Sequence, residues 1–224
     1  MKNLCVIPAR KGSKRIKNKN IIDFYGKPLI YYPINNAIKS KIFSKIIVST
    51  DSIKIADISK KYGAEIPYLR NKQLSKGSVG IYDVVKDIIN YESKNGHNYD
   101  YICCILPTSP LLDHKLIIRT HKKIKKINNN YLITCVKYPT PIFKSFKIKK
   151  NRISLNYPKN INMQSQYLSE DYHDAGQLYW ASNKIWNKKS KIINNGAYVH
   201  KFELNETWDI NDKYDLDITK KLFR

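Results

Sequence analysis

The sequence predicts an α/β fold with a mainly parallel central sheet and helices on both of its faces. Two observations support this prediction: apolar runs of strand length alternate with longer helical patterns, and those runs are apolar throughout, as strands buried on both faces are. The 224 residues are enough for one good core, and no internal repeat divides them. We therefore expect one domain over residues 1–224.

The predicted elements follow one another in strand and helix pairs. Strands are expected at 4–8, 45–50 and 101–107, and each precedes a helical pattern, at 28–40, 52–63 and 113–127. Asp51 and Ser52 form the N-cap region of the second helix, and Gly63 ends it. Asp113 caps the third helix. Each capping signal falls at a predicted boundary, which supports the order of elements.

The alternation fails between residues 138 and 172. Within this segment, the pattern on either side of Lys150 and Asn151 predicts a hairpin with a polar turn. An excursion of this kind usually forms an interface or a lid. Beyond it, strands are expected at 177–182 and 197–204, and a final helix from about Asp212.

The composition leaves a nucleic-acid-binding protein open as a second class. The formal net charge is +23, from 41 Lys and Arg against 18 Asp and Glu, and basic surfaces bind phosphate backbones. Lysine and asparagine are spread through the whole chain, however, and no recognised nucleic-acid module is present. We expect no nucleic-acid partner and no membrane span. The four cysteines lie in apolar runs without metal-binding spacing, which favours buried thiols and a cytoplasmic protein.

Ligands of open α/β sheets collect at the carboxyl ends of the strands. The loops to inspect therefore follow Pro8, Thr50, Leu106, Tyr179 and Leu204.

The first of these loops is strongly basic. It contains neither a P-loop motif nor a dinucleotide fingerprint. Gly12 and Ser13 allow a tight turn whose N–H groups can point at an anion, while Arg10, Lys14 and Lys19 close around it. A triphosphate, with about four negative charges, fits this cradle.

The segment PARKGSKRIKNKN, residues 8–20, resembles the P-A-R-x-G-S-K-x-[IL]-x-x-K-N signature of the CMP-N-acetylneuraminate synthetase family. The resemblance continues through 23–40, 46–52, 68–75 and 106–111 and reaches WDINDKYDL at 208–216. It implies a Rossmann-like nucleotidyltransferase fold, in which the anomeric hydroxyl of an acidic nine-carbon sugar attacks the α-phosphorus of CTP. It also implies a homodimer that pairs through the protruding segment 138–172.

The resemblance and the cradle together assign roles to individual residues. Catalytic roles fall on Arg10, Lys19 and Asp209, and nucleotide binding on Arg10, Gly12, Ser13, Lys14, Lys19, Asn20, Arg70, Ser78, Pro107 and Thr108. Sugar contacts fall on Lys144, Tyr172, His173, Asp174 and Gln177. Asp209 and Asn211 are expected to hold Mg²⁺, which takes one or two carboxylates besides phosphate oxygens and waters.

Several positions depart from the family pattern. Asn211 stands where the family has a second Asp, residues 75–80 replace an acidic turn, and Gln164 stands where relatives often carry Arg. These changes leave a catalytically weakened relative as an alternative. The segment 172–180 resembles the branch that activates pseudaminic acid, and Leu106 replaces a Gln that sialic acid enzymes direct toward the sugar. N-acetylneuraminate and legionaminate remain the alternative substrates.

Overall fold

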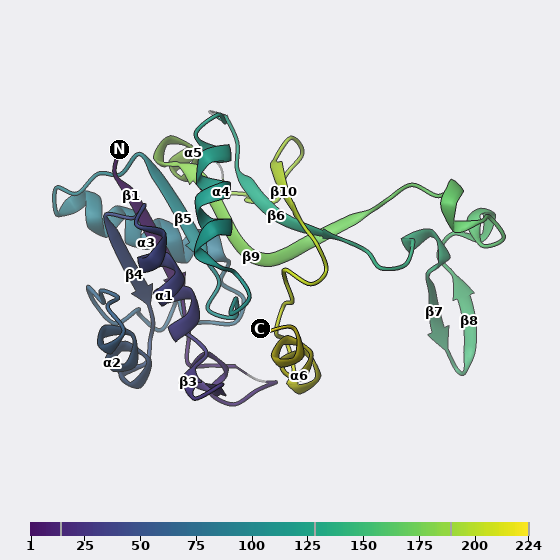
Figure 1. The fold of residues 1–224 in the computed structure, drawn as a ribbon, viewed down its shortest axis with the longest axis horizontal. Helices are drawn as coiled ribbons and strands as arrows, with labels where there is room; N and C mark the ends of the chain where they lie inside the picture. The colour runs from purple at the N-terminus through teal and green to yellow at the C-terminus, as the bar shows by residue number, and fades with distance from the viewer. Residues whose placement is uncertain (14, 128, 189, 224) are drawn as a thin grey trace.

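The computed structural model describes residues 1–13, 15–127, 129–188 and 190–223, and Figure 1 shows their fold. A six-stranded sheet forms its centre, with the strand order β10-β6-β9-β5-β1-β4. Its strands are β1 (Asn3–Pro8), β4 (Lys45–Ser49), β5 (Tyr101–Ile105), β6 (Leu132–Lys137), β9 (Tyr172–Ser182) and β10 (Tyr198–Phe202). Only β9 runs antiparallel to its neighbours within this sheet of the described chain. The predicted mainly parallel sheet is confirmed.

Helices cover both faces of the sheet, also as predicted. They are α1 (Tyr31–Ser40), α2 (Ile53–Lys61), α3 (Ile81–Lys94), α4 (His114–Ile124), α5 (Asn183–Lys188) and α6 (Lys213–Leu222). On one face, α1, α2 and α4 contribute Ile34, Ile55 and Ile117 to a buried cluster. On the other face, α3 and α5 bury Ile88 and Trp186. These two layers hold the sheet rigid beneath its loops.

The helix starts explain which helices the sequence reveals. The side chains of Ser52, Asp113 and Asp212 accept backbone N–H bonds at the N-caps of α2, α4 and α6. Helix α3 is absent from the prediction. It follows the loop 75–80, whose glycines and serines are typical of a turn, and its N-cap residue Gly80 offers no side-chain hydrogen bond.

The direction of β9 corrects one expectation about the site. The loop predicted after Tyr179 does not exist, because β9 continues to Ser182. Since β9 is antiparallel to β5, its register places Leu178 beside Ile105 at the carboxyl edge of β5. The beginning of β9, rather than its end, therefore reaches the edge where ligands are expected.

Residues 138–172 project from the sheet as an arm (Figure 1). The arm contains the short 3-10 helices η2 (Ile142–Lys144), η3 (Pro158–Asn160) and η4 (Ser165–Tyr167) and the hairpin strands β7 (Phe146–Lys149) and β8 (Arg152–Leu155). The hairpin is confirmed, and its turn residues Lys150 and Asn151 have positive φ angles of 49° and 60°. Ile148 and Ile153 pair across the hairpin, and both are largely exposed.

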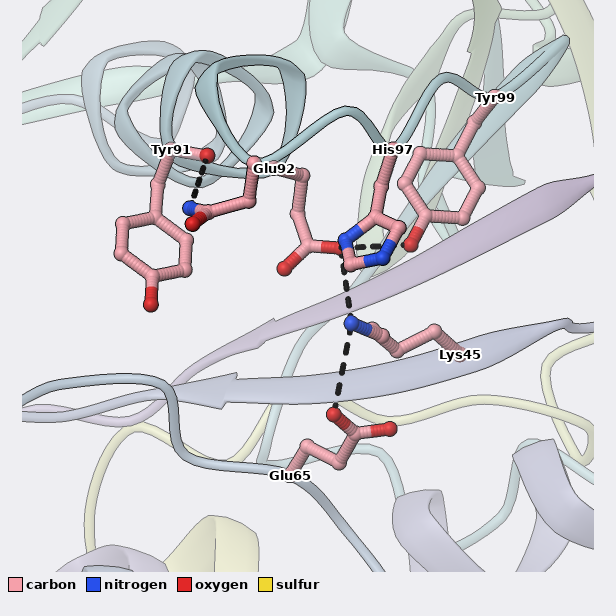
Figure 2. Close-up of polar contacts among 7 residues, drawn as sticks. Lys45, Glu65, Tyr91, Glu92, His97 and Tyr99 are labelled. Carbon is pink, nitrogen blue, oxygen red and sulfur yellow. Dashed lines mark hydrogen bonds and ion pairs between the residues drawn. The ribbon is translucent and has the colours of Figure 1, made fainter.

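A buried ion pair lies at the amino edge of the sheet, where β4 begins (Figure 2). Glu92, 2% exposed, accepts bonds from Lys45 Nζ at 3.0 Å and Tyr99 OH at 2.7 Å, and Glu65 also contacts Lys45. Every charge in this group has a partner, so it ties α3 to β4. It is structural, because the ligand edge lies at the other ends of these strands.

The remaining elements are small. They are η1 (Lys19–Ile21), β2 (Asp23–Phe24) and β3 (Lys27–Pro28), and the last two pair as a hairpin beside α1. Helix α6 packs against this region through Leu216, which shares a cluster with Phe24 and Leu29. Within the described ranges, no helix is both long and apolar enough to cross a bilayer.

Candidate active site

A cavity of about 500 Å³ opens at the carboxyl edge of β1 and β5. We call it the main cavity. It is lined by Pro8, Arg10, Ser13, Arg15, Lys19, Asn20, Leu106, Pro107, Thr108, Asp209 and Asn211. These residues come from the loops after Pro8 and Leu106, which the sequence singled out, and from the segment between Leu204 and α6, which it also singled out. The structure thus brings most of the predicted nucleotide-binding residues to one place.

Hydrogen bonds to its backbone hold the basic loop beside this cavity. Lys11 N donates to Asp51 Oδ1 at 2.7 Å, and Asn20 Nδ2 donates to the carbonyl oxygen of Arg10 at 2.9 Å. Ala9 N donates to Ser49 O at 2.9 Å. These bonds fix the backbone on both sides of Arg10 and so position the start of its side chain beside the main cavity. The sequence placed Asp51 only in a helix cap, so its role in holding the loop was missed.

Lys19 and Asp209 bring opposite charges into the main cavity. Lys19 Nζ donates to the carbonyl oxygen of Ile210 at 2.6 Å. Burial lowers the pKa of Lys19, and the charge of Asp209 opposes that shift. Burial raises the pKa of Asp209, while the hydrogen bond from Asn211 and the charge of Lys19 act the other way. Water therefore solvates both groups poorly, which strengthens their interaction with a charged ligand.

Arg15 and Asn211 form a chain of hydrogen bonds that leads to Asp209. Arg15 donates to Asn211 Oδ1 at 2.7 Å, and Asn211 Nδ2 donates to Asp209 Oδ2 at 2.8 Å. Arg15 belongs to the predicted basic loop but was not among the predicted site residues. Gly12 lies in the same loop and is exposed without lining the cavity, and Lys14 lies outside the described residues.

A smaller cavity of about 140 Å³ continues from the main cavity past Arg10 to Arg70. Arg70 is 5% exposed, and its Nε atom has no hydrogen-bond partner among the described residues. Burial lowers the pKa of Arg70, and neighbouring Arg10 adds to this effect while Asp51 opposes it. A buried guanidinium with an unused donor is suited to an anion.

The loop 71–80 passes over this smaller cavity. A Cβ on Gly77 would lie 3.2 Å from the Arg10 guanidinium, so glycine permits the close approach. Ser78, predicted to bind the nucleotide, is exposed and lines neither cavity. The cavity is instead lined on this side by Leu74, Lys76 and Val79.

A third cavity, about 350 Å³, adjoins the main one; we call it the side cavity. It is lined by Val136, Pro139, His173, Asp174, Ala175, Leu204, Thr207, Trp208, Asp209, Asn211 and Asp215. Asp209 and Asn211 line both cavities. Gly176, at φ 61°, lets β9 approach this boundary, because a Cβ there would lie 3.3 Å from the Asp209 carboxyl carbon.

Two of the predicted sugar-binding residues line the side cavity. His173 is exposed, its ring lies 4.7 Å from that of Tyr138, and its Nδ1 is 2.9 Å from the carbonyl oxygen of Asp174. Asp174 accepts bonds from Tyr179 OH at 2.5 Å and Gly176 N at 3.1 Å. Burial and the neighbouring Asp174 raise the pKa of Tyr179, so this hydroxyl stays a donor.

The other three predicted sugar contacts lie elsewhere. Gln177 is fully buried and donates to the carbonyl oxygens of Ala175 and Trp208, so it supports the wall of the site from behind. The Tyr172 hydroxyl donates to Glu170 and accepts from Lys201, and Tyr172 lines none of the three cavities. Lys144 lies in the projecting arm (Figure 1). The sequence could identify these residues by motif, but it could not show which of them line a cavity.

The residues around Asp209 offer few ligands for the expected Mg²⁺. Among the described residues, no group of three or more His, Cys, Asp or Glu side chains could hold a metal ion. Asp209 offers one carboxylate, whereas Asn211 directs its Nδ2 at Asp209 and its oxygen at Arg15. One carboxylate fits Mg²⁺ when nucleotide phosphates and waters supply the remaining ligands. The expected amide ligand does not fit this arrangement.

Comparisons with known proteins identify the family of this chain. The family model described as cytidylyltransferase matches residues 4–195. The chain is 36% identical over 225 residues to a pseudaminic acid cytidylyltransferase of Campylobacter jejuni, covering 100% of this chain and 97% of the relative. It is 27% identical to a CMP-N,N'-diacetyllegionaminic acid synthase of Legionella pneumophila, covering 99% and 96%.

Solved structures share the fold at low identity. A CMP:2-keto-3-deoxy-manno-octonic acid synthetase complexed with CTP aligns with a TM-score of 0.73 and 14% identity, over 99% of this chain and 98% of the other. A 4-diphosphocytidyl-2C-methyl-D-erythritol synthase aligns with a TM-score of 0.70 and 12% identity, over 100% of both. The expected nucleotidyltransferase fold is confirmed.

Proposed function

Because the chain belongs to the cytidylyltransferase family, we propose that it couples CTP to pseudaminic acid and forms CMP-pseudaminic acid and pyrophosphate. CTP-dependent cytidylyl transfer to a sugar acid follows from the full-length similarity to its relatives. One structural observation supports the assignment: a basic cavity suited to a triphosphate adjoins a second cavity, and the two share Asp209 and Asn211. The reacting atoms would meet at that boundary.

The chemistry at this boundary is a single displacement. The anomeric hydroxyl oxygen bonds to the α-phosphorus, the bond from that phosphorus to the oxygen bridging it to the β-phosphorus breaks, pyrophosphate leaves, and the hydroxyl proton passes to water. Arg10, Arg15 and Lys19 line the main cavity, where the phosphates would lie. Fixed cations stabilise charge that develops on phosphate oxygens and cost no reorganisation during the reaction.

We propose Mg²⁺ as the cofactor, held by Asp209 together with the nucleotide phosphates. The ion would neutralise phosphate charge as a Lewis acid. The support is the position of Asp209 at the boundary of the two cavities and the poor solvation of its carboxylate. Asn211 would orient Asp209 through its Nδ2 group.

We propose a homodimer formed through the arm 138–172. An isolated two-stranded hairpin is marginal in water, and this one exposes Ile148 and Ile153. Lys144 lies on the same arm and lines none of the three cavities of the site. A partner chain would cover the hairpin, and the arm could then carry Lys144 toward the partner's site.

We also propose a cytoplasmic enzyme that has no nucleic-acid partner. All four cysteines are buried as free thiols, which suits a reducing compartment. The cationic side chains that line the main cavity would bind a triphosphate, so they do not require a nucleic-acid partner. Tight binding to duplex DNA or RNA with a steep dependence on salt would contradict the second part of this proposal.

One experiment tests the proposed reaction. The protein is incubated with CTP, Mg²⁺ and, separately, pseudaminic acid, N,N'-diacetyllegionaminic acid and N-acetylneuraminic acid, and the CMP-sugar is identified by mass spectrometry. We expect the highest kcat/KM with pseudaminic acid. A higher value with either other sugar would overturn the substrate assignment. Failure to turn over any of them, with CTP still bound, would favour the alternative of a catalytically weakened relative.

A further inference from the structure

The side cavity is lined by both apolar and polar groups. Val136, Leu204 and Trp208 contribute apolar surface, while Asp174 and Thr207 contribute polar groups. Its volume of about 350 Å³ lies within the range of small-molecule sites. A ligand that fills it must therefore present an apolar group and hydrogen-bonding groups close together.

Among the polar residues that line the side cavity, Thr207 has a buried hydroxyl group without a hydrogen-bond partner in the described part of the chain. Its side chain is 3% exposed. An unpaired buried hydroxyl costs about 1–3 kcal/mol, so it calls for an explanation. Rotation about χ1 exchanges the hydroxyl and methyl groups of threonine, so a ligand in the cavity can recruit the hydroxyl.

The carboxylates around the cavity differ in how much bonding capacity they have left. Asp215 already accepts bonds from Trp208 Nε1 and from the backbone N–H groups of Asn211 and Asp212. Asp174 accepts one bond on each oxygen, from Gly176 N and Tyr179 OH. A carboxylate has about four acceptor positions, so Asp174 can still accept an N–H from a ligand. This combination matches an acylamino group, which has one N–H donor, one carbonyl acceptor and an apolar end.

The reaction fixes which end of the sugar acid enters the side cavity. In a 2-keto acid sugar the carboxylate is attached to the anomeric carbon, so it must lie near the α-phosphorus at the boundary with the main cavity. Arg15, bonded to Asn211 at that boundary, offers a cation for the carboxylate. The far end of the sugar then extends away from the phosphates, toward Asp174 and Thr207.

We propose that the side cavity holds the second acylamino group of the sugar acid, the one that N-acetylneuraminate lacks. Asp174 accepts its N–H, Thr207 Oγ1 donates to its carbonyl oxygen, and the acyl end packs against Leu204 and Trp208. This proposal rests on the proposed function and adds to it a specificity-determining residue, Thr207. Pairing a buried polar group discriminates more strongly than filling an apolar gap.

The test is Thr207→Val, which replaces the hydroxyl by a methyl group of similar size. We expect kcat/KM for pseudaminic acid to fall about 5- to 50-fold, mainly through KM, with KM for CTP unchanged. For N-acetylneuraminate we expect a change below about twofold. Thr207→Ser, which keeps the hydroxyl, should retain most of the activity toward pseudaminic acid.

A stability measurement separates this role from a structural one. Without ligands, Thr207→Val should have a Tm equal to or above that of the wild type, because the variant removes an unpaired buried hydroxyl. The matched control is Thr134→Val. Thr134 is also buried, but its hydroxyl bonds Leu178 and it does not line the cavity. The control should lower Tm and leave the ratio of the two sugars unchanged.

The failures can be told apart. If the wild type does not turn over pseudaminic acid, the proposed function fails and the assignment of the acylamino group fails with it. If the wild type turns it over and Thr207→Val does so equally well, only this inference fails. A drop in Tm for Thr207→Val as large as that for Thr134→Val would also overturn it, because the hydroxyl would then have a partner within the protein.

Discussion

Replacing Lys19 by alanine should slow the reaction far more than the same change at Lys17, two residues earlier in the same loop. Lys19 lines the main cavity and is held by the carbonyl oxygen of Ile210, and burial lowers its pKa. Lys17 is exposed and lines none of the three cavities of the site. The pair therefore compares one poorly solvated cation with one that water screens.

The size of the effect follows from Coulomb's law. Two unit charges about 4 Å apart interact by roughly 4 kcal/mol at an effective dielectric constant of about 20. Arg10 and Arg15 line the same cavity and replace part of that interaction. We expect Lys19→Ala to cost about 2–4 kcal/mol of transition-state stabilisation, a loss of roughly 30- to 1,000-fold in kcat/KM. Lys17→Ala should cost less than about threefold, because exposed charges contribute little.

The assay is the initial rate of pyrophosphate release at varied CTP and saturating sugar acid. Tm is measured for both variants, since loss of the bond to Ile210 could loosen the segment before α6. Equal, small effects of the two substitutions would refute the role of the cavity in binding the triphosphate. A large loss that follows a drop in Tm below the assay temperature would instead show that Lys19 acts only on folding.

Further predictions concern the metal, the sugar and the arm. Asp209→Asn should abolish turnover, whereas Asn211→Asp should keep it and lower the Mg²⁺ requirement; full activity of wild type in EDTA would contradict this. Because burial raises the pKa of Asp209, the folded protein disfavours the carboxylate. Asp209→Asn should therefore raise Tm without ligand at neutral pH, and the gain should vanish as pH falls through the folded pKa. His173→Ala should lower the ratio of kcat/KM for pseudaminic acid to that for N-acetylneuraminate without changing Tm. Gln177→Ala should lower both this ratio and Tm. An unchanged ratio in His173→Ala would exclude the His173 side chain from the sugar site. Ile148→Asp, at a position 70% exposed, should halve the mass found by light scattering, and an unchanged mass would argue against the arm as the interface.

The sequence was sufficient for features that depend on local patterns. Capping by Ser52 and Asp113 and the hairpin turn at Lys150 are formed by neighbouring residues, and the structure confirms them. The location of the main cavity could also be predicted, because the carboxyl ends of parallel strands share one edge of the sheet. The basic loop after Pro8 therefore had to lie beside the loop after Ile105.

Contacts between distant segments could not be read from the pattern. Asp51 holds the N–H of Lys11 across 40 positions, and nothing in the local sequence marks that pairing. Thr207 is similar, since an unpaired hydroxyl becomes visible only when every neighbour has been placed. Helix α3 was missed because its apolar positions follow a loop rich in turn residues and a glycine N-cap.

The antiparallel strand β9 explains why the residues that line the main cavity and the side cavity lie so far apart in this chain. A parallel strand places its last residues at the ligand edge, whereas β9 places its first residues there, as the pairing of Ile105 with Leu178 requires. His173 and Asp174 therefore line the site directly after the arm ends. The basic loop is instead held by the end of β4 and the residues after it, through Ser49 and Asp51. A change of sugar specificity should consequently require substitutions at the start of β9 and near Thr207, and none in residues 8–20.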